Sequence, residues 1–260
     1  MPSPLHPAGP PPSRAEVAPM PATVLLVNPN RMSPPVAPLA LEYLAAALED
    51  AGTPFALCDL CFADDPAAAL AAAVREYDPR LIAITMRNSD DCYCATQHSF
   101  IPDMQQLLQG LRKHSAQPVV LGGAGYSAAP EAILELTGAD YGVMGDGEEA
   151  LPKLAAALAE GGDVTHIPGL VWCDAAATHR TPPAYADFGQ TALARDHLDN
   201  ARYFARGGQA GLETKRGCPM TCTFCADPLS KGTRCRLRPP RVVAQEARHL
   251  IAQGVDAIHL

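Results

Sequence analysis

The chain alternates short apolar runs with segments in which apolar residues recur at helical spacing. Five runs have the length and composition of strands buried on both faces of a sheet: 23–27, 54–57, 81–86, 118–121 and 141–144. Helical spacing follows each run, as at Leu41, Leu44 and Leu48. Strands that alternate with helices in this way predict an α/β fold with a parallel sheet and right-handed crossovers.

Composition and pattern divide the chain into four parts. Residues 1–21 are rich in proline and lack periodicity, so we expect a disordered tail. A Rossmann-like domain is expected at 22–160 and a connector at 161–205, with a small hairpin strand near 167–172. The last part, 206–260, has the pattern of one β–α unit and a second strand: a strand at 211–214, a helix across 243–253 and a strand from 257.

Polar residues and glycines follow the predicted strands. Because ligands bind at the carboxyl ends of parallel strands, these loops form the candidate binding edge. Its candidate residues are Asn28, Pro29, Arg87, Asn88, Gly122, Gly123, Gly125, Ser127, Gly145, Gly147 and Glu148. Glycines allow a ligand to approach the backbone, and helix N-termini offer N–H groups to a phosphate.

One alternative for this edge is a dinucleotide site. Gly123 and Gly125, with Ala128, have the form of a dinucleotide fingerprint. However, they follow the fourth strand, whereas the fingerprint belongs to the first β–α turn. NAD or FAD is therefore the weaker interpretation.

Three cysteines stand close together in the last part of the chain, at Cys218, Cys222 and Cys225. Structural zinc usually takes four ligands in paired form, and no second pair follows here. Iron–sulfur cubanes are held by cysteine thiolates, normally four. Three thiolates would leave one iron open to another ligand, although a structural zinc knot remains an alternative.

The spacing C-x-x-x-C-x-aromatic-C, with Phe224 as the aromatic residue, resembles the signature of radical S-adenosylmethionine (SAM) enzymes. The resemblance implies a [4Fe-4S] cluster whose open iron chelates SAM, and a 5′-deoxyadenosyl radical formed when the cluster donates an electron. It also implies that Phe224 lies against the adenine. The family fold is a partial (β/α) barrel, so we expect this chain to be a truncated fragment that is inactive alone.

Residues 22–170 resemble the cobalamin-binding domain that precedes the radical SAM domain in one subclass. The shared features are Asn28-Pro29, Gly122-Gly123, Pro130-Glu131, the run 145–148 and the run 167–170. The resemblance implies that the loop 122–127 lines a slot for the nucleotide tail of cobalamin. It also implies that the loop 145–148 meets the corrin rim.

Cobalt is not expected to take a histidine ligand from this chain. Many cobalamin proteins supply one from an Asp-x-His-x-x-Gly loop, and the sequence has no Asp-x-His. Arg87 instead follows the third strand, where its charge is placed to approach the lower face and to discourage axial ligation. A loop salt bridge between Arg87 and Asp90 or Asp91 is the alternative.

These features together predict a cobalamin-dependent radical SAM enzyme. The resemblance implies methyl transfer to an unactivated carbon or a phosphorus through methylcobalamin, on a small-molecule or peptide natural product. It also implies an electron donor such as flavodoxin or ferredoxin. Two alternatives remain: a ring-forming enzyme of the anaerobic porphyrin cyclase type, and a non-catalytic cobalamin sensor with a structural metal.

Charge and hydropathy limit the kinds of binding partner and the cellular compartment that we expect for this chain. A net charge of −8 gives no basic footprint for nucleic acid. No apolar stretch reaches the length of a membrane span, and the N-terminus lacks the pattern of a signal peptide. We therefore expect a cytoplasmic protein. Its other cysteines are interpreted as structural or incidental: Cys58, Cys61, Cys92, Cys94, Cys173 and Cys235.

Overall fold

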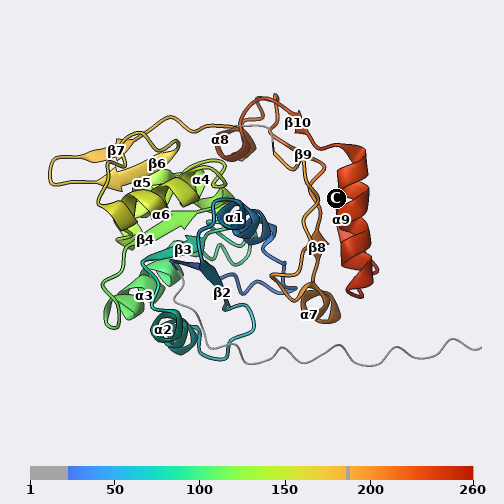
Figure 1. Ribbon diagram of the computed structural model, residues 1–260, viewed down its shortest axis with the longest axis horizontal. Coiled ribbons are helices and arrows are strands. Elements are labelled where there is room, and N and C mark those ends of the chain that lie inside the picture. The colour runs from blue at the N-terminus through green and yellow to red at the C-terminus, as the bar shows by residue number, and fades with distance from the viewer. Residues whose placement is uncertain (1–22, 186–187, 260) are drawn as a thin grey trace, which may run out of the picture.

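Figure 1 shows the computed structural model of the chain, which describes residues 23–185 and 188–259. The disordered tail expected at 1–21 lies outside the described residues. A sheet with helices on both faces, coloured blue to yellow, forms one side of the molecule, and the C-terminal segment, coloured orange to red, lies along the other.

The central sheet has seven strands in the order β2–β1–β3–β4–β5–β6–β7. Neighbours from β2 to β5 are parallel, whereas β6 and β7 join antiparallel. The bounds are β1 Val24–Asn28, β2 Phe55–Asp59, β3 Leu81–Thr85, β4 Val119–Gly122, β5 Tyr141–Val143, β6 Leu170–Cys173 and β7 Thr178–Arg180. The predicted five-stranded parallel sheet is confirmed, and a hairpin from the expected connector extends it by two strands.

Helices cover both faces of this sheet. Their bounds are α1 Leu39–Asp50, α2 Pro66–Tyr77, α3 Ile101–Arg112, α4 Ala124–Ser127, α5 Pro130–Thr137 and α6 Ala150–Glu160. Successive side chains of a strand point to opposite faces, so Leu25 and Val27 of β1 pack with α2, α3 and α5. Val24 and Leu26 pack with α1 and α6 on the other face.

Apart from one helix of 13 residues, the C-terminal segment is built from short elements. Their bounds are α7 Asn200–Ala205, β8 Ala210–Gly211, β9 Lys215–Arg216, α8 Asp227–Lys231, β10 Arg236–Leu237, α9 Pro240–Ala252 and β11 Ile258–His259. The single strand expected at 211–214 differs from the structure, because the chain changes its pairing partner there. β8 pairs parallel with β11, and β9 pairs antiparallel with β10.

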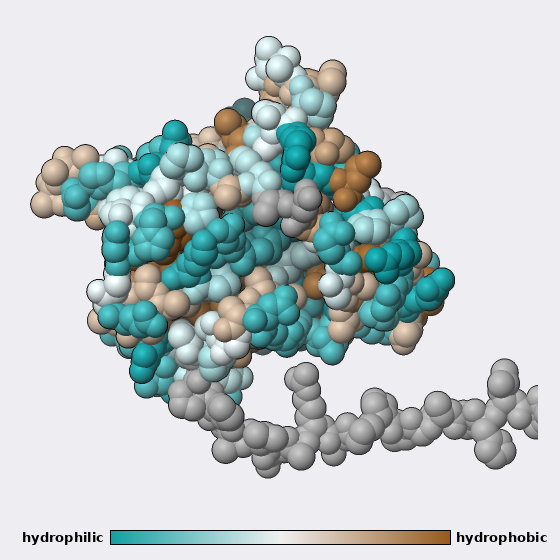
Figure 2. Space-filling view, turned by 45° about the horizontal axis from the view of Figure 1, so that its top comes forward, coloured by the Kyte–Doolittle hydropathy of each residue, from teal (hydrophilic) through white to brown (hydrophobic). Residues whose placement is uncertain are grey.

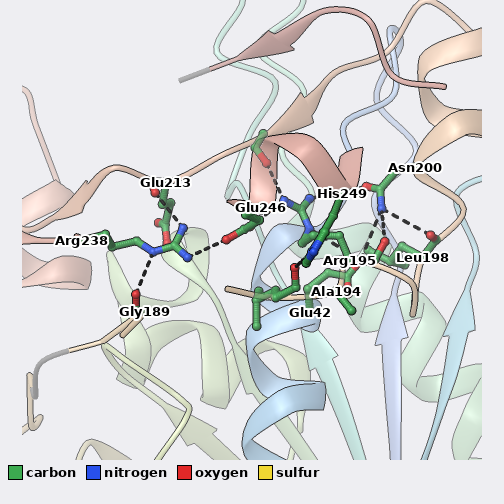
Figure 3. A network of polar contacts seen from close by, with 12 residues as sticks. Glu42, Gly189, Ala194, Arg195, Leu198, Asn200, Glu213, Arg238, Glu246 and His249 are labelled. Carbon is green, nitrogen blue, oxygen red and sulfur yellow. Dashed lines mark hydrogen bonds and ion pairs between the residues drawn. The ribbon is translucent and has the colours of Figure 1, made fainter. Parts of the chain in front are cut away.

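A buried polar network joins the C-terminal segment to the first domain (Figure 3). Glu246 of α9 accepts hydrogen bonds from Arg195 Nη1 at 2.9 Å and from Arg238 Nη2 at 2.5 Å. Asn200 donates to Glu42 of α1 at 3.4 Å, and Arg195 Nε lies 3.7 Å from the same Glu42 oxygen. All five side chains are buried, and this burial raises the pKa of Glu42.

The surface is mixed in character. The face drawn in Figure 2 is mainly hydrophilic, with apolar side chains scattered over it in small groups. Within residues 23–185 and 188–259, none of the helices has the length and apolar character needed to span a bilayer.

Candidate functional site

The first part of the site is a cavity of about 180 Å³ beyond the carboxyl ends of β3, β4 and β5. Predicted site residues line it: Gly122, Gly123, Gly145, Gly147 and Glu148. Leucines of α1 and α6 form an apolar wall, and Glu213, Arg216, Ser230 and Lys231 of the C-terminal segment close another side. We call this space the slot cavity.

Two of the glycines are required by the chain itself. Gly123 has φ +103°, and a Cβ there would lie 2.6 Å from the Met86 carbonyl oxygen. A Cβ on Gly125 would lie 2.4 Å from the Asn88 carbonyl carbon. These glycines therefore let α4 pack against the loop after β3. Gly125 is not among the described residues that line the slot cavity.

Ser127 joins the two glycine loops without lining the slot cavity. Its hydroxyl donates to the Gly123 carbonyl at 2.9 Å and accepts from the Gly145 amide at 3.1 Å. The side chain is buried. Ser127 therefore sets the spacing between the loops that carry Gly123 and Gly145.

The second part of the site is a cavity of about 900 Å³ beyond the ends of β1, β2 and β3. It is lined by the predicted residues Pro29, Arg87 and Asn88. Thr85, the last residue of β3, lines both this cavity and the slot cavity. The two spaces therefore adjoin at the end of β3, where the strand order β2–β1–β3 departs from the chain order. We call the larger space the main cavity.

Arg87 contributes a positive charge to the main cavity. It is exposed, and its Nη1 donates to Asn88 Oδ1 at 3.1 Å. In the described structure it forms no ion pair with Asp90 or Asp91, so the alternative salt bridge is not formed.

Asp90 and Asp91 are engaged within their own loop. Asp90 accepts from the Cys92 amide at 2.7 Å, which lowers the pKa of the Asp90 carboxyl. The Thr96 hydroxyl and the Tyr93 amide donate to Asp91 and lower its pKa. Both carboxylates therefore have hydrogen-bond donors other than Arg87.

Asn28 holds the edge of the site together but lines neither cavity. Its Nδ2 donates to Asp59 Oδ1 and to the Tyr203 hydroxyl, both at 2.9 Å. The Tyr203 hydroxyl donates to Asp59 Oδ2 at 2.8 Å. Burial, with the Asp59 charge beside it, raises the pKa of Tyr203. Sequence reasoning missed Asp59 and Tyr203, since a lone aspartate and a distant tyrosine carry no motif.

The three candidate cluster ligands lie on one irregular loop of the C-terminal segment. Cys218 is half-buried, whereas Cys222 and Cys225 are exposed. Phe224 between them is 91% exposed. Among the described residues, no three His, Cys, Asp or Glu side chains lie close enough together to hold a metal ion. The structure thus places the three thiols on one loop but does not gather their sulfur atoms, and their role stays a prediction.

The donor set of this loop nevertheless suits an iron–sulfur cluster. All three thiols are free, and thiolates are the soft ligands that such clusters take. The loop starts at Gly217. This residue has φ +83°, and a Cβ added to it would lie 2.1 Å from the Arg234 carbonyl oxygen, so the position requires glycine. The Cys218 amide then donates to the Gly232 carbonyl at 3.1 Å, which fixes one end of the loop.

The slot cavity and the cysteine loop meet at Arg216, directly before Gly217. Its guanidinium is largely buried and donates to Glu148 at 2.6 Å and to Glu213 at 2.9 Å. Burial alone lowers the pKa of Arg216, but Glu148, Glu213 and Asp146 outweigh it and raise the pKa above its ordinary value. Arg216 therefore keeps its charge at the wall of the cavity.

Gly123→Ala is expected to destabilise the domain. The methyl group would meet the Met86 carbonyl, and alanine disfavours the positive φ, so the free energy of unfolding should fall by about 1–3 kcal/mol. Urea unfolding at equilibrium measures this. Gly122→Ala is the matched control, because a Cβ there has only the Val143 carbonyl at 3.7 Å, and it should cost less than about 1 kcal/mol. Equal losses for the two variants would contradict the packing argument.

Comparison with known proteins agrees with this geometry. The model of the B12 binding domain matches residues 31–155. Tryptophan 2-C-methyltransferase of Streptomyces laurentii is 34% identical over 91% of this chain and 48% of its own length. The chain thus spans about half the length of this relative.

Solved structures show the same relationship. The radical SAM methyltransferase TsrM of Kitasatospora setae, with tryptophan and a SAM analogue bound, superposes with a TM-score of 0.83 at 38% identity, over 89% of this chain and 46% of that one. Its form with cobalamin and a [4Fe-4S] cluster gives a TM-score of 0.79 at 36% identity, over 90% and 46%. The domain match, the three-cysteine loop and these relatives together show that the chain belongs to the cobalamin-dependent radical SAM enzyme family.

Proposed function

We propose that the chain is the cofactor-binding part of a cobalamin-dependent radical SAM methyltransferase. The observation that carries the proposal is the pair of adjoining cavities at the carboxyl edge of the sheet, with the three free thiols on a loop anchored beside the smaller one. The relatives named above are methyltransferases, which favours methyl transfer over ring formation.

We assign the slot cavity to the nucleotide tail of cobalamin. Leu41, Leu44 and Leu151 offer an apolar wall for an aromatic base, and the opposite wall is glycine backbone. Lys231, also in the lining, supplies a positive charge for a phosphate. An apolar wall, bare backbone and the cations Arg216 and Lys231 form a set that suits a base linked to a phosphate.

We assign the main cavity to the corrin. Its volume of about 900 Å³ lies near the upper end of ordinary ligand pockets, roughly 300–1,000 Å³. Arg87, free of the neighbouring carboxylates, presents its charge to this space, and Asn88 offers an amide to the corrin side chains. With cobalamin bound in this cavity, Arg87 would hold a positive charge beside the corrin.

We assign Cys218, Cys222 and Cys225 as ligands of a [4Fe-4S] cluster. Phe224, which is exposed between two of them, is then placed to pack on the adenine of SAM. When bound, the cluster supplies an electron to SAM, and cobalamin supplies a carrier for the methyl group. The chain's own residues hold these groups: the thiols hold the cluster, and the glycine loops hold the tail.

We infer a small-molecule or peptide natural product as the substrate. Tryptophan is the first compound to test, because the Streptomyces enzyme is named for it and the TsrM structure has it bound. Flavodoxin or ferredoxin is the expected electron donor. We place the protein in the cytoplasm, since all nine cysteines are free thiols and a reducing compartment keeps them so.

Anaerobic reconstitution of the 260-residue chain tests the proposal. The purified chain is incubated with iron, sulfide and hydroxocobalamin, desalted, and analysed for iron, sulfide, cobalt and zinc. We expect cobalt in a one-to-one ratio to the chain and about four iron and four sulfide. Tetrahedral zinc in place of iron, or a chain that retains no cobalamin, would reject the proposed function.

A further inference from the structure

The contact between the C-terminal segment and the slot cavity is made by a two-stranded ribbon. β9 and β10 pair antiparallel, with Arg216 opposite Arg236. Both guanidinium groups point at the loop 145–148, which lines the slot cavity. The cysteine loop starts at Gly217, directly after Arg216. The ribbon therefore touches the proposed tail site on one side and carries the proposed cluster ligands on the other.

Arg216 makes most of this contact. It donates to Glu148 at 2.6 Å, and the same nitrogen lies 3.4 Å from Asp146. Its guanidinium also stacks over two rings, 4.6 Å from the centroid of Tyr43 and 4.2 Å from that of Phe188. These contacts place the guanidinium at the boundary between the ribbon and the loop that lines the slot cavity.

Arg236 holds the same loop from the paired strand. It forms an ion pair with Asp146 and donates to the Lys231 carbonyl at 2.9 Å. Its guanidinium lies 5.4 Å from the Tyr185 and Phe188 centroids. Phe188 is thus shared by both arginines, and ion pairs join both strands of the ribbon to the cavity loop.

We propose that Arg216 is a positioning residue that couples the cysteine loop to the slot cavity. The inference rests on the proposed function, because it takes a cluster and cobalamin as the two ligands. A cluster orders the loop that starts after Arg216, and this in turn fixes the Arg216–Glu148 contact at the cavity wall. Cobalamin then binds a cavity that is already ordered and loses less conformational freedom on binding.

The coupling has a measurable consequence. Cobalamin should bind the cluster-loaded chain more tightly than the cluster-free chain, and by reciprocity cobalamin should tighten the hold on the cluster. We expect the cobalamin dissociation constant of the cluster-free chain to be at least about five times that of the cluster-loaded chain, and we call this quotient the ratio. Fivefold is the lower end of the usual coupling between two sites. We compare this ratio rather than either constant alone, because a general loss of packing would raise both dissociation constants.

Equilibrium dialysis against hydroxocobalamin, under anaerobic conditions, measures both dissociation constants. Iron and sulfide are counted in each sample to define the loaded and cluster-free chain. In Arg216→Gln the ratio should fall to within about twofold of one, since the amide carries no charge for Glu148. Glu148→Gln removes the same contact from the cavity side and should also bring the ratio to within about twofold of one. With two variants, the test remains valid if one of them does not fold.

Arg180→Gln is the matched control. Arg180 pairs with Glu131 at 2.9 Å on the surface of the first domain, with both side chains over 40% exposed, and the ratio should match that of the wild type. A wild-type chain that binds both cofactors with a ratio of one overturns the inference, as does an unchanged ratio in Arg216→Gln. A wild-type chain that binds neither cofactor rejects the proposed function instead.

Discussion

Cys222→Ser is expected to remove nearly all of the iron and sulfide from the anaerobically reconstituted chain. Cys222 is exposed in the middle of the loop, so the change leaves packing untouched and alters only the ligand. A serine hydroxyl is a poor ligand for iron–sulfur clusters, and two thiolates are too few to hold a cubane that already lacks its fourth. Iron and sulfide analysis with electronic absorption measures the loss.

The matched control is Cys235→Ser. Cys235 is also exposed and free, lies in the same segment of the chain and precedes β10. It should retain the iron and sulfide content of the wild type. Retention of the cluster by Cys222→Ser, or equal loss in both variants, would contradict the assignment of the three-cysteine loop.

Glu246→Gln is expected to lower the free energy of unfolding by about 3–5 kcal/mol. Its two carboxylate oxygens accept from Arg195 at 2.9 Å and from Arg238 at 2.5 Å, and all three side chains are buried. Glutamine has nearly the same shape, but it leaves two buried guanidinium groups without their shared counter-charge. The large cost comes from those unpaired charges rather than from the loss of a favourable pair.

Equilibrium unfolding in urea, followed by far-UV circular dichroism, measures this change. Glu149→Gln is the control, because Glu149 pairs with Lys153 at 2.6 Å on the surface of α6, with both side chains nearly half exposed. It should change the free energy of unfolding by less than about 0.5 kcal/mol. Similar unfolding midpoints for the two variants would show that the network in Figure 3 does not hold the segments together.

The parallel sheet could be predicted because its strands are fully apolar. β1 and β3 are buried at every position, so each appears as a run of apolar residues without alternation. The helices between them could be predicted from the helical spacing of their apolar residues, as at Leu41, Leu44 and Leu48 of α1. Asp65 caps α2 through the Ala68 amide, and Gly161 takes the left-handed position after α6.

Elements whose form depends on distant partners could not be predicted. A small hairpin strand was expected near 167–172 and corresponds to β6, but the sequence did not show that β6 pairs with β5 or that the half-polar strand β7 follows it into the sheet. The bend between β8 and β9 arises because β11 and β10 pair with different halves of the segment. α7 has six residues, too few for a periodic pattern.

For the candidate site, the sequence located the loops better than it assigned roles within them. Gly122 and Gly123 line the slot cavity, and so do Gly145 and Gly147, although the resemblance had implied that these two meet the corrin rim. Gly125 is used instead for contact between loops. A glycine required by a ligand and one required by the backbone look the same in a sequence, because both lack a side chain for the same steric reason.

The short β6–β7 hairpin has a consequence for how the molecule behaves at high concentration. Without it, β5 would present an apolar edge with free backbone groups, which invites strand-to-strand association between molecules. The hairpin ends the sheet with a three-residue strand that carries Arg180, tied to Glu131. A short edge strand that carries charge disfavours pairing with a strand of a second molecule, so the hairpin reduces the tendency of the sheet to aggregate.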